Sequence, residues 1–169
     1  MTRGDRPGVG ESWDERNLLL TMLRHTQATA VRKVSGLSQE LASATPLPTS
    51  PRMAAANVLN HLRWVERSWV NDRLLGGEDD GPWTKENPDA EFDEGSALPV
   101  DEVIRLYEEE AARTRAVFAE HDLDAQMAKA TPEYPLTARW ILLHLIEETA
   151  RHNGHLDILR EMADGSVGD

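Results

Sequence analysis

Apolar residues recur every three or four positions along four long stretches of this sequence. That spacing gathers them on one face of a helix and therefore predicts four amphipathic α-helices. The stretches cover residues 12–35, 51–75, 99–121 and 137–164. Four helices of this length, without a credible strand or an internal repeat, predict an all-α fold, and specifically a four-helix bundle.

Residues with capping preferences mark the starts of the first two helices. Ser12 followed by Glu15 forms a capping-box pattern. Ser50 precedes Pro51, as a cap precedes a proline at the first helical position. The last helix is predicted to begin at Thr137.

Three connections join the predicted helices, at residues 37–49, 76–98 and 122–136. The second is long and acidic, and loops of that length are often functional. Ahead of the first helix, residues 1–11 are predicted to be a flexible tail. The rest of the chain, residues 12–165, is predicted to be one bundle domain whose topology the spacing leaves open.

The charge and cysteine content narrow the possible functions. The chain of 169 residues has 18 Lys and Arg against 30 Asp and Glu, a formal net charge of -12. Acidic proteins repel phosphates, so neither nucleic acid nor an anionic membrane is expected as a partner. Without cysteine, the chain has no thiolate ligand or nucleophile of its own. Any metal must be held by His and carboxylates, and any reacting thiol must come from another molecule.

No targeting segment is apparent. The first residues, MTRGDRPGVGE, lack the apolar centre of a secretory signal. The most apolar stretch, residues 140–146, is far shorter than the roughly 20 residues of a membrane-spanning helix. A cytoplasmic protein without a membrane span is therefore expected.

Three of the six histidines fall in the last predicted helix. At about 100° per residue, four of its polar residues project within an arc of about 80°. These residues are His144, Glu148, His152 and His155. Apolar residues share the arc, so this face is predicted to point into the bundle. A carboxylate buried there needs partners, and a metal ion would satisfy it together with the histidines.

Glu148 and His152 lie four residues apart, a spacing that lets two side chains of one helix meet on one ion. His155 is one turn further along. A third ligand must come from another helix, and His61 is the best candidate because apolar residues flank it mid-helix. Simpler explanations fit the same spacing: a helical histidine on an apolar face is usually a core residue, and Glu–His pairs are common on helix surfaces.

Structural roles are predicted for most other notable side chains. His144 and Asn57 are expected in the core, and residues 108–110, three glutamates, on a solvated face. The tryptophans predicted to pack the bundle are Trp64, Trp69 and Trp140. Trp83, in the acidic connection, either caps a cavity as part of a lid or anchors the loop.

Several segments carry a family resemblance. The strongest is RWILLHLIEETARHNGHLDILRE, which ends at Glu161; others are NHLRWVERSW around His61, PWTKENPDAEF at residues 82–92 and LYEEEAARTRA in the third helix. With these segments the chain resembles the DinB superfamily of metal-binding four-helix bundles. It is most similar to the DUF664 branch, related to mycothiol-dependent enzymes. The resemblance covers residues 12–165 and implies the DinB/YfiT-like bundle.

The resemblance also implies a ligand set. In the superfamily a His of the second helix and a His-x-x-x-His pair of the fourth hold the metal. The second His of the pair matches His152, and Glu148 stands where the first would be. A His, Glu, His set is similar to that of mycothiol-dependent maleylpyruvate isomerase, which implies His61, Glu148 and His152 as ligands. That isomerase has a further C-terminal domain unlike anything in this sequence, so maleylpyruvate isomerisation itself is not expected.

The implied function is a metal-dependent thiol S-transferase. Two imidazoles and a carboxylate suit a divalent metal, Zn²⁺ first and Ni²⁺, Fe²⁺ or Mn²⁺ as alternatives. The resemblance implies that the metal activates a low-molecular-weight thiol, such as mycothiol, for attack on a small electrophile. His155 is either a cofactor-site residue that orients a ligand or a core histidine. A metal hydrolase using bound water, or a non-catalytic metal- or small-molecule-binding stress protein, remains an alternative, and a homodimer is a further expectation.

Overall fold

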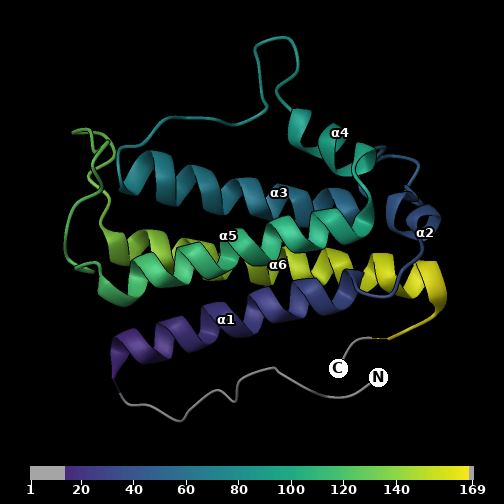
Figure 1. Cartoon of the computed structure of the whole chain (residues 1–169), viewed down its shortest axis with the longest axis horizontal. Helices are drawn as coiled ribbons and strands as arrows, with labels where there is room; N and C mark the ends of the chain where they lie inside the picture. Colours follow the sequence, from purple (N-terminus) through teal and green to yellow (C-terminus); the bar gives the residue numbers. More distant parts are fainter. Residues whose placement is uncertain (1–13, 168–169) are drawn as a thin grey trace.

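The computed structural model describes residues 14–167, and in them the chain forms a bundle of four long helices (Figure 1). These are α1 (Glu15–Val34), α3 (Ala55–Arg67) continued by the π-helix η1 (Ser68–Leu74), α5 (Val100–Glu120) and α6 (Ala138–Asp164). Two short helices, α2 (Gln39–Ser43) and α4 (Ala90–Ala97), lie in the connections. No strand occurs in this part of the chain, so the predicted all-α fold is confirmed. The predicted tail and the Ser12 cap lie outside the described residues.

Helices α1 and α6 run parallel to each other and antiparallel to α3 and α5 (Figure 1). Arg139 at the start of α6 donates to Glu15 at the start of α1, at 2.9 Å. Arg16 donates to the carbonyl of His121, just past the end of α5, at 2.7 Å. Because α3 and α5 point the same way, the chain between them must return along the bundle. This crossover carries α4 over the outer side of α3 and explains the length of the acidic connection.

The ends of α6 agree with the sequence signals. The Thr137 hydroxyl accepts from the backbone N–H of Trp140 at 3.4 Å, and the helix ends at Gly165. Gly165 has a φ of 76°, the left-handed conformation that glycine adopts without strain. The whole predicted range of this helix is therefore confirmed.

Helix α3 corrects the prediction at both ends. It begins at Ala55 rather than at Pro51, because residues 51–54 form a turn. The buried Asn57 side chain donates to the Arg52 carbonyl at 3.0 Å. This carbonyl therefore accepts from a side chain and lies outside the helix. At the other end the α-helix gives way to η1, whose wider turns shift the side chains around the axis.

A polar layer divides the bundle core. Apolar clusters fill the two halves, and between them Gln27 donates to both carboxylate oxygens of Glu66, at 2.9 and 3.0 Å. Arg115 donates in turn to Gln27. Complete burial raises the pKa of Glu66 to about 7. A carboxyl group in the middle of the bundle thus holds its proton more tightly than it would in water.

One of the three glutamates predicted to be solvated is buried. Glu110 is 7% exposed and accepts from Arg113 at 2.7 Å, with Arg67 of α3 3.7 Å away. The face of α5 that carries it is turned toward α3, and the two guanidinium groups compensate its charge.

In residues 14–167 no helix is both long enough and apolar enough to cross a membrane.

Candidate metal centre

Helices α3 and α6 bring His61, Glu148 and His152 together near the middle of the bundle. One ligand atom from each lies within 4.8 Å of the other two. Oε1 of Glu148 is 3.6 Å from Nε2 of His61 and 3.5 Å from Nδ1 of His152. All three side chains are largely buried, with 12 to 19% of each exposed. The three residues proposed from the sequence therefore form one cluster.

The ring of His152 is fixed by its own helix. Its Nδ1 donates to the backbone carbonyl of Glu148 at 3.0 Å, since a carbonyl can only accept. In the neutral ring Nε2 then carries the lone pair. Burial lowers the pKa of His152, and the neighbouring His61 lowers it further. A neutral imidazole with a free Nε2 is the form that binds a metal.

The ring of His61 is held by α4. Nδ1 of His61 lies 3.4 Å from Oε1 of Glu91, while Nε2 faces Glu148. Phe92 stacks on the same ring, with centroids 4.8 Å apart and planes inclined by 11°. A carboxylate behind a histidine fixes its tautomer and orientation, as in carboxylate–histidine–metal arrangements. Glu91 at the edge of the ring and Phe92 on its face thus restrict the rotation of the His61 side chain.

Helix α4 is fastened tightly to α3. Asn60 donates to the Glu91 carbonyl at 2.6 Å and to Oε2 of Glu94 at 2.9 Å. A Cβ at Gly95 would lie 2.8 Å from Cα of Asn57, so only glycine permits this approach. The contacts place Glu91 and Phe92 against His61.

The sequence analysis did not identify Glu91 and Phe92 as site residues. Both belong to the segment PWTKENPDAEF, which carried part of the resemblance, but their connection was predicted as a loop. A helical period over residues 90–97 was the available signal.

His155 lies beside the cluster rather than in it. Its ring meets that of His152 edge to face, with centroids 5.1 Å apart. Its Nδ1 is buried and has no hydrogen-bond partner among the described residues. Such an orphaned buried polar atom fits a site that is completed by a ligand.

The donor set fits a divalent metal ion. It consists of two imidazoles and one carboxylate, whose second oxygen lies 3.6 Å from the exposed Arg151. Three protein ligands leave a coordination position for another molecule. These groups could therefore hold a catalytic ion as well as a structural one.

A cleft of about 280 Å³ opens beside His61. We call it the tryptophan cleft; its lining residues are His61, Trp64, Val65, Ser68, Trp69, Trp83, Pro88 and Glu91. Trp64 and Trp69 were predicted to pack the bundle. Trp69 does pack against one of the apolar core clusters, and both residues also form walls of the cleft. Trp83 also lines it and packs edge to face on Trp64, a position that agrees with both the lid and the loop-anchoring interpretation.

His144 and Trp140 correct two further predictions of core packing. The two rings stack 5.1 Å apart at the surface of α6, where Trp140 is 41% exposed and His144 is half-buried. The ring of Trp69 contacts both, with its centroid 5.4 Å from that of Trp140 and 4.9 Å from that of His144. Both lie at the outer edge of the helix face that carries Glu148. His144 is one turn from Glu148, and Trp140 is two turns from it.

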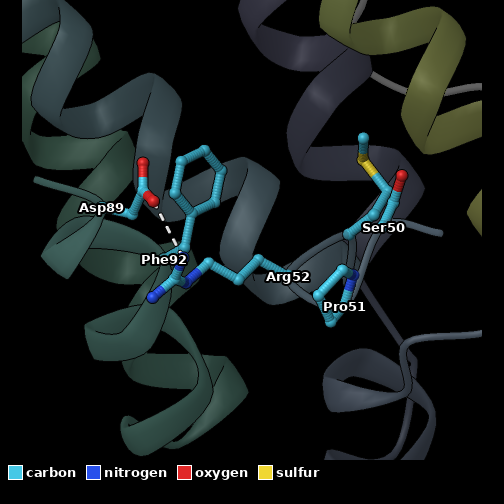
Figure 2. Close-up of a pocket in the computed structure, with 6 residues that line it drawn as sticks. Ser50, Pro51, Arg52, Asp89 and Phe92 are labelled. Carbon is cyan, nitrogen blue, oxygen red and sulfur yellow. Dashed lines mark hydrogen bonds and ion pairs between the residues drawn. The ribbon is translucent and has the colours of Figure 1, made fainter. Parts of the chain in front are cut away.

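A second hollow lies at the N-terminal end of α3, on the other side of α4 (Figure 2). Its volume is about 260 Å³, and it is lined by Ser50, Pro51, Arg52, Met53, Asp89 and Phe92. Arg52 and Asp89 form an ion pair of 2.8 Å across it, and the Phe92 ring stands beside them (Figure 2). Phe92 therefore contacts both this hollow and the ring of His61.

A comparison with protein families matches residues 18–165 to the family described as Mycothiol-S-transferase. A search of curated proteins finds no match. The matched range includes all four long helices except the first turn of α1, and it contains every residue of the cluster.

Proposed function

The chain belongs to the mycothiol-S-transferase family, and from this premise we propose that it joins a low-molecular-weight thiol to a small electrophile with the help of a divalent metal. Family membership implies the thiol partner. Metal dependence, the ligand roles and the electrophile are our proposal. The observation that supports it most is that one ligand atom each of His61, Glu148 and His152 lies within 4.8 Å of the other two.

His61, Glu148 and His152 are the proposed ligands, and Zn²⁺ is the ion that this donor set suits best. Bound there, a divalent ion lowers the pKa of a thiol from about 8.5, so that the sulfur is an anion and a nucleophile at neutral pH. Since the chain has no cysteine, the sulfur belongs to a cosubstrate.

The surrounding residues have distinct proposed tasks. Glu91 and Phe92 hold the ring of His61, and the Glu148 carbonyl holds that of His152. Nδ1 of His155, which has no partner among the described residues, is available to orient the cosubstrate or a ligand beside the cluster.

Thiol transfer is favoured over hydrolysis because Glu66 and Glu147, the carboxylates close in sequence to His61 and Glu148 that could act as a general base, do not face the cluster. Glu66 is turned into the polar layer toward Gln27, and Glu147 is largely exposed beside His144. A cytoplasmic location and a homodimer remain predictions.

The test combines metal analysis with a conjugation assay. Purified protein, loaded with Zn²⁺ and desalted, is expected to retain about one ion per chain. It should conjugate mycothiol to monobromobimane, and a chelator should abolish the reaction. H61A should lose both properties, whereas H121Q, a histidine change outside the cluster, should keep both. Conjugation that survives the chelator and H61A would refute the metal-dependent mechanism.

A further inference from the structure

The tryptophan cleft has no role assigned by the family match. It adjoins the metal cluster through His61, which belongs to both. We propose that this cleft binds the electrophile and selects neutral, planar aromatic molecules. The inference rests on the proposed function, because it assigns one of the two substrates of the same site.

Two walls of the cleft are held in place before any ligand arrives. Nε1 of Trp64 donates to Glu94 at 2.5 Å, and the Arg63 guanidinium lies 4.3 Å over its ring. Trp69 is held from outside by the stacked pair of His144 and Trp140. Rigid aromatic walls lose little entropy when a flat ligand packs against them.

The third wall, Trp83, depends on a glycine. A Cβ at Gly81 would come within 2.2 Å of the Trp83 ring, so the ring can fold back over residue 81 only when glycine is there. In that position Trp83 meets Trp64 edge to face, with centroids 5.8 Å apart. The crossover thus supplies one aromatic wall and α3 supplies the facing one.

The size of the cleft suits a small ring system. An apolar cavity of about 150 Å³ is enough for benzene, and this cleft measures about 280 Å³. The space therefore accommodates a substituted single ring or two fused rings. Besides the indole N–H groups, its lining side chains offer the Ser68 hydroxyl, the Glu91 carboxylate and the His61 imidazole as polar groups.

The charge of the cleft disfavours anions. No lysine or arginine is among its lining residues, and its one carboxylate, Glu91, is nine-tenths buried. The guanidinium groups that lie over two of its tryptophans are paired with carboxylates, Arg63 with Glu94 at 3.2 Å and Arg73 with Asp72 at 3.2 Å. A lining with a carboxylate and without a cation repels an anionic electrophile and admits a neutral one.

For a benzylic chloride the reaction balances without another reactant. The thiol sulfur forms a C–S bond to the benzylic carbon, and the C–Cl bond breaks. Chloride leaves with the bonding electron pair, and the thiol proton passes to solvent.

Binding can be measured without turnover. The Zn²⁺-loaded protein, labelled with ¹⁵N, is titrated with 4-nitrobenzyl alcohol and with the anion 4-nitrobenzenesulfonate, and the indole N–H signals are followed. The neutral probe should shift the signals of Trp64 and Trp83 and bind at least tenfold more tightly than the anion. W83A should weaken its binding at least tenfold, and M162A, an exposed apolar change on α6 outside the lining, less than twofold. Equal binding of the two probes, or unchanged binding in W83A, would overturn the proposal.

A kinetic arm separates this inference from the proposed function. With mycothiol as the thiol, W83A should lower kcat/KM at least tenfold for 4-nitrobenzyl chloride but less than twofold for iodoacetamide, which has no ring. G81A should act in the same direction as W83A. Equal losses for both electrophiles would refute the cleft assignment and leave the transferase intact. Probe binding at the indoles without any conjugation would refute the transferase and leave the cleft as a binding site.

Discussion

Nδ1 of His152 donates to the backbone carbonyl of Glu148, one helical turn earlier in α6, at 3.0 Å. The same residue, Glu148, thus offers its carboxylate to the cluster and uses its main chain to orient a second ligand. An i, i+4 pair on one helix therefore sets both the position and the tautomer of His152.

Substitutions of His152 and His155 should distinguish a metal ligand from a residue that only flanks the cluster. H152A is expected to lower Zn²⁺ affinity by more than the roughly 10–100-fold that loss of an outer partner causes. H155A should lower it less than about tenfold, since that ring only flanks the cluster. Competition titration with a chromophoric chelator measures both. Equal effects of the two changes would contradict the assignment.

Glu91 is expected to act through His61. E91Q leaves the volume unchanged but removes the carboxylate behind Nδ1, and we expect roughly 10–100-fold weaker Zn²⁺ binding. D93N makes the same change of charge in the same helix, where the side chain faces Arg52 at 3.1 Å, and should have little effect on affinity. If both variants bind the ion equally, Glu91 does not position the ligand.

The contribution of Glu66 to the stability of the bundle should fall as pH rises from about 4.5 to about 7. In the unfolded chain Glu66 titrates near 4.5, whereas burial raises its pKa to about 7 in the folded protein. The folded state therefore binds the proton more tightly, and its advantage is complete below pH 4.5 and lost above about pH 7. The difference corresponds to about 3 kcal/mol in the free energy of unfolding.

Urea unfolding of E66Q at several pH values tests this account of Glu66. The amide has no proton to lose, so the decline between pH 5 and 8 should be shallower than in the wild-type protein. The buried Glu110, whose pKa is also raised by burial, remains in the variant and contributes the residual slope. E108Q, an exposed change on the same helix, should leave the slope as it is. A steep decline retained in E66Q would contradict the burial argument.

Two glycine-to-alanine changes should have opposite effects. At Gly95 the new methyl would meet the backbone of Asn57, so G95A is expected to destabilise the fold by about 1–3 kcal/mol. At Gly154, in the middle of α6, nothing lies within 4 Å of a built Cβ. G154A should therefore stabilise the protein by up to about 1 kcal/mol through helix propensity. Thermal unfolding of the two variants compares them directly, and a gain of stability in G95A would disprove the close packing of α4.

Periodicity and local caps were sufficient for most of the long helices, whereas the ligand set came from the family resemblance added to the helical spacing of Glu148 and His152. Thr137 and Gly165 mark the two ends of α6. Each makes hydrogen bonds with residues three or four positions away, so these ends can be predicted from the local sequence. The start of α3 was wrong because the Asn57 side chain competes for the Arg52 carbonyl, a contact that helix propensities do not register.

The surroundings of the cluster could not be predicted in the same way. The contact of Glu91 with His61 depends on the return path of the crossover, and that path depends on α3 and α5 being parallel. The burial of Glu110 and the surface position of Trp140 depend likewise on which face each helix turns toward its neighbours. Periodicity identifies a face but does not say what covers it.

The crossover has a consequence for how this architecture can change. None of the buried members of the two core clusters lies in residues 76–98. The three proposed ligands belong to α3 and α6, whereas Trp83, Glu91 and Phe92 all belong to the crossover. Around Trp83, in the part of the segment before α4, mutations can therefore reshape the cleft without touching the core clusters or the proposed ligands. Changes at Glu91 or Gly95 differ, because these residues contact His61 and the backbone of α3. The loop before α4 is thus the part of the chain where the cleft can diversify at the least cost to folding stability.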